Sequence, residues 1–80
     1  MDIHKLHILI HALGLDRNSR PYRNRFVTGP GSVDYYNCMS LVEQGYMDHY
    51  RSLDGGGNDF FAVTVKGVGI VMNYALKESK

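Results

Sequence analysis

Residues 46–65 read YMDHYRSLDGGGNDFFAVTV, and this stretch decides the fold. Its two ends, residues 46–51 and 60–65, are together rich in aromatic and β-branched side chains, which favour strands. Residues 52–59 between them contain three consecutive glycines, which are typical of a turn. The stretch therefore predicts a two-stranded antiparallel β-hairpin with a long glycine-rich tip.

Two helices are predicted before the hairpin, over residues 2–13 and 33–44. In the first, apolar residues recur at the i, i+3, i+4, i+7 spacing of a helix that packs on a core. The second follows Ser32, a favourable N-cap, and precedes Gly45, which suits the position after a helix end. We expect its outer face to expose Asp34, Asn37, Ser40 and Gln44.

A third helix is predicted after the hairpin, over residues 65–78, with Thr64 as its N-cap. Its inner face is expected to hold Val65, Val68, Val71, Met72, Ala75 and Leu76. Residues 16–31 show no sustained apolar period, and we expect them to form an ordered loop anchored by Tyr22, Phe26 and Val27.

These elements define an α+β fold with three helices and a two-stranded antiparallel hairpin. With 80 residues and a 44% apolar fraction, the chain is expected to form one domain, residues 1–80, around a single small core. A lone cysteine excludes an internal disulfide framework, and no apolar run is long enough to cross a membrane. We expect a small reduced protein of the cytoplasm.

Residues 38–80 resemble the second half of a winged-helix domain of the MarR or PadR type. The phrases that carry the resemblance are Leu41-Val42-Glu43-Gln44-Gly45-Tyr46 and Val63-Thr64-Val65-Lys66-Gly67. The resemblance implies a DNA recognition helix, a wing formed by the hairpin and a final helix that builds a dimer. Because residues 16–31 lack the additional helix of that family, the domain is expected to be a degenerate winged helix.

Most of the chain is also similar to short phage and prophage proteins of unknown function. The resembling phrases are His11-Ala12-Leu13-Gly14-Leu15, Tyr22-Arg23-Asn24-Arg25-Phe26-Val27-Thr28-Gly29-Pro30-Gly31-Ser32 and Cys38-Met39-Ser40-Leu41-Val42-Glu43. This resemblance implies an accessory protein of the phage type in a bacterial host, and it implies no established activity.

Basic residues concentrate in one segment although the net charge is only +1. Residues 17–26 contain four arginines interleaved with aromatic and amide side chains, a composition that suits contacts with phosphates and bases. A solvated loop whose arginines pair with acids of the same chain is the alternative. The candidate binding residues of the segment are Arg17, Arg20, Tyr22, Arg23 and Arg25.

Two functions are open for such a chain. Duplex DNA is the first, because Asn37, Ser40 and Gln44 are able to read base edges and Arg51 adds a cation near the hairpin. A host or phage protein is the second, because the predicted recognition helix carries Asp34 and Glu43, which repel phosphates. The family resemblance favours DNA, and the charge distribution favours a protein partner.

Catalysis and metal binding find little support in the sequence. His4, His7 and His11 share one side of the first helix, yet they lack a carboxylate neighbour on that side and are expected to form its polar margin. Cys38 falls on an apolar helix face, which indicates a buried thiol rather than a nucleophile. We therefore expect a non-enzymatic protein without cofactor or metal.

Self-association is expected through the last helix. Ile70 and Tyr74 lie four residues apart, on the side opposite the predicted inner face. A helix that is apolar on two faces usually buries both. The sequence thus predicts a homodimer through these two residues.

Overall fold

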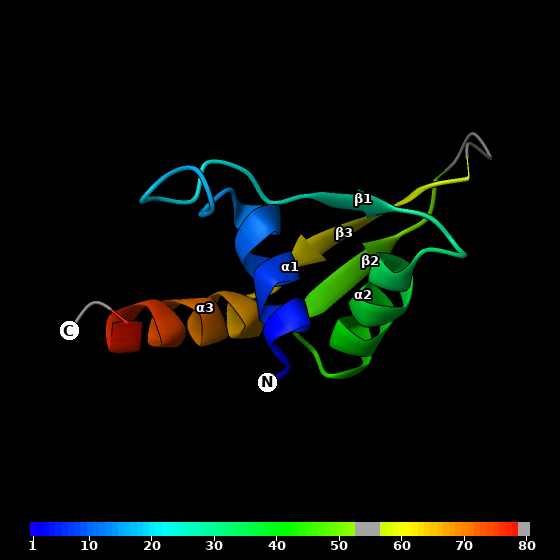
Figure 1. Ribbon diagram of the computed structural model, residues 1–80. Coiled ribbons are helices and arrows are strands. Elements are labelled where there is room, and N and C mark those ends of the chain that lie inside the picture. Colours follow the sequence, from blue (N-terminus) through cyan, green and yellow to red (C-terminus); the bar gives the residue numbers. More distant parts are fainter. Residues whose placement is uncertain (53–56, 79–80) are drawn as a thin grey trace.

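Three helices and three strands make up the chain (Figure 1). The structure, a computed structural model, describes residues 1–52 and 57–78, with side chains as far as residue 74. The elements in order are α1 (Ile3–Leu13), β1 (Phe26–Thr28), α2 (Val33–Glu43), β2 (Met47–Tyr50), β3 (Asp59–Val63) and α3 (Val65–Glu78). The predicted α+β fold with three helices is confirmed.

The strands form one antiparallel sheet in the order β1-β3-β2. The predicted hairpin is present as β2 and β3, although much of its glycine-rich tip, residues 53–56, lies outside the described residues. The sheet has a third strand that was not predicted, because residues 26–28 of the expected loop pair with β3 in the register Phe26↔Phe61 and Thr28↔Asp59. A three-residue strand is too short to show an alternating pattern of its own.

The first two helices have clear capping residues. The Asp2 carboxylate accepts a hydrogen bond from the His4 backbone N–H at the start of α1, and Gly14 ends that helix with φ at 80°. At the start of α2, the Ser32 hydroxyl oxygen accepts from the Tyr35 backbone N–H at 3.1 Å. Among the described residues, no helix combines the length and apolar composition that crossing a membrane requires.

The core lies between the sheet and the helix layer. Figure 1 shows α1 and α2 on the same face of the sheet, while α3 extends away from it. Burial alternates along the strands, so that Met47, Phe61 and Val63 point toward the helices. The largest fully buried side chains are Phe61, Leu9, Leu41, Met47, Val71 and Cys38.

The inner face of α3 differs from the prediction at its first residue. Val65 is 91% exposed, so its predicted place on the inner face was wrong, whereas Val71 is buried as predicted. In this turn it is Gly67 that packs closely against the rest of the chain, since a Cβ on it would overlap the Tyr46 carbonyl oxygen. Val68 and Met72 are half-buried, and the side chains of Ala75 and Leu76 lie outside those described.

The end of α2 and the start of α3 are joined by hydrogen bonds. The Thr64 hydroxyl donates to the Gly45 carbonyl oxygen at 2.6 Å and accepts from the Gly67 backbone N–H at 3.1 Å. The Thr64 backbone N–H donates to the Tyr46 carbonyl oxygen, and the Lys66 ammonium group donates to the Gln44 carbonyl oxygen. The two phrases that carry the winged-helix resemblance therefore meet in space as a structural joint.

Candidate nucleic-acid interface

The arginine-rich segment is ordered because it completes the C-terminal end of α1. The last four carbonyls of a helix have no partner within it, and here residues 14–25 supply their hydrogen bonds. The backbone N–H of Leu15 donates to the Ile10 oxygen, that of Gly14 to His11, that of Arg25 to Ala12 and that of Tyr22 to Leu13. The predicted ordered loop thus has a specific cause.

The Arg23 side chain forms hydrogen bonds within its own chain. Its guanidinium donates twice to the His11 carbonyl oxygen, from Nε at 3.1 Å and from an Nη at 2.7 Å, and lies 5.3 Å from the centre of the Tyr22 ring. His11 also forms a 2.7 Å hydrogen bond with Asp16, which holds the pKa of that carboxyl below its ordinary value. For this arginine the structure favours the alternative of pairing within the chain.

Asn24 has a structural role that sequence reasoning missed. Its side-chain amide donates to the Val63 carbonyl oxygen at 3.0 Å, and its side-chain oxygen accepts from the Val63 backbone N–H at 2.7 Å. Extending the β1–β3 register by two residues places residue 24 opposite Val63, so the side chain replaces a backbone pair of the ladder. An asparagine just before a short strand is the only sequence signal of this contact.

Arg25 is the arginine that reaches the sheet. Its guanidinium lies 5.8 Å from the centre of the exposed Phe60 ring, a cation–π distance. Together with Arg23 and Val27 it also lines a surface hollow of about 300 Å³ beside β1. Cations and apolar side chains are therefore interleaved along this edge of the sheet.

The other predicted arginines differ in their surroundings. Arg17 and Arg20 are exposed in the segment between α1 and β1. Arg51 is also exposed, and its charge contributes to the lowered pKa of Asp59, although the main cause is the 2.7 Å hydrogen bond from His49. Arg25 thus presents a cation at β1, Arg17 and Arg20 lie in the segment before it, and Arg51 directly follows β2.

The predicted base-reading face of α2 is less accessible than expected. Asn37 and Ser40 are half-buried rather than exposed, because they face α1, where the Lys5 ammonium group donates to the Ser40 hydroxyl at 2.9 Å. Gln44 is exposed as expected. The outermost large apolar side chains of α2 are instead Val33, 77% exposed, and Tyr36, 65% exposed.

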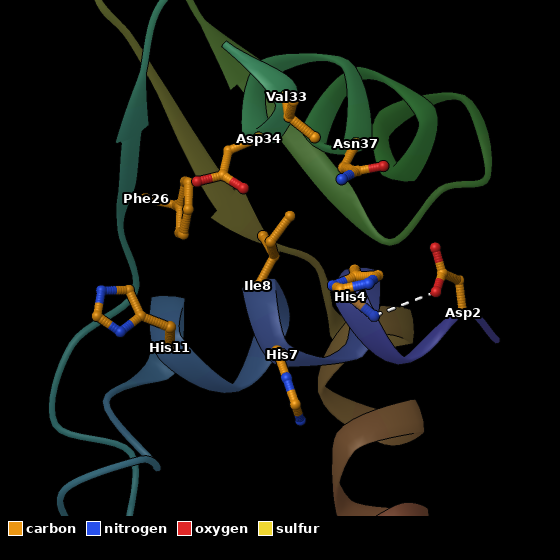
Figure 2. A pocket seen from close by; sticks show the side chains of 9 residues that line it. All are labelled: Asp2, His4, His7, Ile8, His11, Phe26, Val33, Asp34 and Asn37. Atoms are coloured by element: carbon orange, nitrogen blue, oxygen red, sulfur yellow. Dashed lines mark hydrogen bonds between the residues drawn. The ribbon is translucent and has the colours of Figure 1, made fainter.

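A groove of about 600 Å³ separates α1 from α2 (Figure 2). Asn37 and Asp34 border it from α2, and His4 faces Asn37 from α1, whereas the His7 ring points away from α2. His11 turns toward Phe26, with ring centres 5.7 Å apart. The three histidines do not converge, and no cluster of metal-ligating side chains occurs within residues 1–52 and 57–74.

Cys38 is a buried thiol, as predicted. It is 0% exposed, and burial followed by the nearby Asp34 charge raises its pKa to about 12. Because only the thiolate is nucleophilic, this side chain is unreactive at neutral pH while the protein is folded.

A polar and aromatic cluster under the hairpin was not predicted. His49 and Asp59 form their hydrogen bond at 16% side-chain exposure each, and the His49 ring stacks on Phe61 with centres 4.7 Å apart. Tyr35 meets both rings edge-on. His49 and Asp59 lie ten residues apart in sequence, and only the β2–β3 pairing brings them together.

Ile70 and Tyr74 are half-buried against the core of their own chain. Ile70 borders a hollow with Lys5, Gln44 and Tyr46 near the start of α1. Part of the apolar surface that the dimer prediction relied on is therefore used within the monomer, and the homodimer stays a prediction.

Comparisons with known proteins found no match. No family model, no curated protein and no solved structure matches the chain.

Proposed function

We propose that this chain is a small non-enzymatic DNA-binding protein of the phage accessory type, acting in the cytoplasm of a bacterial host. One observation carries the proposal: the Arg25 guanidinium lies among exposed aromatic and apolar side chains at β1, and the exposed Arg17 and Arg20 precede it in the same segment. The exposed acids Asp34 and Glu43 belong to α2, on the opposite face of the sheet.

This arrangement supports phosphate contacts at β1 rather than base reading by α2. Neutralisation of phosphates supplies most of the affinity of a DNA-binding protein. The segment that carries the arginines is held by α1 through backbone bonds and by β3 through Asn24, so its cations are presented on a fixed backbone. The proposed phage setting rests on the sequence resemblance described for residues 11–15, 22–32 and 38–43.

A protein partner is the second candidate, supported by the surface of α2. Val33 and Tyr36 are strongly exposed there beside Asp34 and Glu43. An apolar surface with acidic neighbours suits a basic host or phage protein. This surface is separate from β1, which makes the two candidates distinguishable by mutation.

The test is the salt dependence of binding to a labelled random-sequence duplex, followed by fluorescence anisotropy. Arg25→Gln, and Arg17→Gln together with Arg20→Gln, should each weaken binding and flatten the plot of log affinity against log salt by about one unit per arginine that contacts a phosphate. Lys66→Gln, which removes a charge at the α2–α3 joint, is the matched control and should leave the slope unchanged.

A parent protein that does not bind the duplex or single strands at low salt would refute the proposal. Unchanged slopes in all arginine variants would refute it as well. Retention of a partner that is lost on Tyr36→Ala but kept in the arginine variants would support the protein-binding alternative.

A further inference from the structure

The outer face of the sheet, opposite the helices, carries a row of exposed apolar side chains. Val27, Phe60 and Tyr50 are direct cross-strand neighbours on β1, β3 and β2. Their residues are 46%, 39% and 55% exposed, respectively. Since α1 and α2 lie on the other face, neither of these helices covers the three side chains.

Charge on this outer face is placed asymmetrically. Extending the register of β1 by one residue puts Arg25 beside Ala62, with its guanidinium against the Phe60 ring. On β2, Asp48 pairs with Ala62, which on this face is one cross-strand row away from the row of Val27, Phe60 and Tyr50. The β1 side of the apolar row therefore offers a cation, and the row itself, with Phe60 and Tyr50, offers two aromatic rings.

The size of the row indicates what it can bind. Three strands about 4.8 Å apart, with a rise of about 3.4 Å per residue, give a face of roughly 200 Å². A stable protein interface buries about 800 Å² on each partner, so a second copy of this chain would find too little area here. Planar nucleobases fit such a face, because two of them need only two exposed rings and a cation for the phosphate.

We propose that the outer face of the sheet binds single-stranded DNA, with unpaired bases stacked on Phe60 and Tyr50 and an adjacent phosphate held by Arg25. The inference rests on the proposed DNA-binding function and adds its substrate class. Bases in a duplex are stacked on both faces and cannot lie on a protein ring, whereas bases of a single strand can. The face therefore prefers the single strand.

The experiment measures anisotropy of a labelled oligothymidine of about 12 nucleotides, within the roughly 4–16 nucleotides that comparable domains cover. A blunt duplex of the same length and an oligouridine are measured beside it. We expect the single-stranded DNA to bind at least about ten-fold more tightly than the duplex, and Phe60→Ala and Tyr50→Ala each to weaken it about ten-fold.

Two further variants separate stacking from folding. Tyr50→Phe keeps the ring and should bind like the parent, while losing part of the quenching of tyrosine fluorescence that base stacking causes in this tryptophan-free chain. Tyr36→Ala removes a tyrosine of α2 that is even more exposed than Tyr50, and it should change neither binding nor quenching. Thermal unfolding of each variant shows that it is folded at the assay temperature.

Equal or tighter binding of the duplex would overturn the inference, and so would parent-like binding of the single strand by folded Phe60→Ala and Tyr50→Ala. If those results came with a reduced salt slope in Arg25→Gln, the proposed DNA-binding function would stand without the stacking site. Absence of any binding by the parent protein would refute both the DNA-binding function and the stacking site. Tighter binding of the oligouridine would overturn the choice of DNA as substrate.

Discussion

Replacing Asn24 with alanine should be among the most destabilising changes outside the core. The substitution removes both hydrogen bonds to Val63, at 2.7 and 3.0 Å, and leaves the backbone N–H and C=O of a residue that is 6% exposed without these partners. A net value of about 1 kcal/mol per bond, with a further cost for the unpaired groups, gives a loss of roughly 2 to 3 kcal/mol. For a domain whose whole stability is about 5–10 kcal/mol, this is a large fraction.

Urea denaturation followed by far-UV circular dichroism measures the effect. With an m-value of about 1 kcal/mol/M, the midpoint should fall by about 2 to 3 M without a change in slope. Asn18→Ala is the matched control, because Asn18 is exposed in the same segment and only its backbone N–H is bonded there, to Gly14. A midpoint for Asn24→Ala that corresponds to less than about 0.5 kcal/mol would refute the role assigned to Asn24.

Three further predictions concern other parts of the molecule. Gly67→Ala should lower the melting temperature strongly, since the new methyl group meets the Tyr46 carbonyl oxygen, and an unchanged melting curve would contradict this contact. The His49 hydrogen bond lowers the pKa of Asp59 in the folded protein. The ionised carboxylate therefore stabilises the fold fully above pH 3.8, and this stabilisation is lost as the pH falls through the lowered pKa. Asp59→Asn should flatten the acid dependence of the free energy of unfolding in that range. Cys38 should react with a thiol reagent only in denaturant, as a titration of free thiol with and without urea would show, because burial raises its pKa to about 12.

The helices were predictable because their signals are local. Asp2, Gly14 and Ser32 act at the predicted ends through their own side chains or dihedral angles, within a few residues of the backbone they cap. The hairpin was predictable for a similar reason, since its two strands adjoin one turn. In each case the residues that start or end the element lie within a few positions of it in the sequence.

The parts that were missed depend on contacts between distant residues. β1 exists because Asn24 and residues 26–28 meet β3, more than thirty residues later, and no local pattern marks a strand of three residues. Asn37 and Ser40 lost their expected exposure because α1 packs beside them. The outer sheet face follows from the same unpredicted strand, since Val27 has neighbours there only once β1 is paired.

The hydrogen bonds of Thr64 have a mechanical consequence. Only one residue separates β3 from α3, a connection that would act as a hinge if it were free. Thr64 and Lys66 instead bind the carbonyls of residues 44–46, so tilting α3 breaks contacts with the end of α2. A force applied to the end of α3 is thus transmitted to residues 44–46, between the end of α2 and the start of β2.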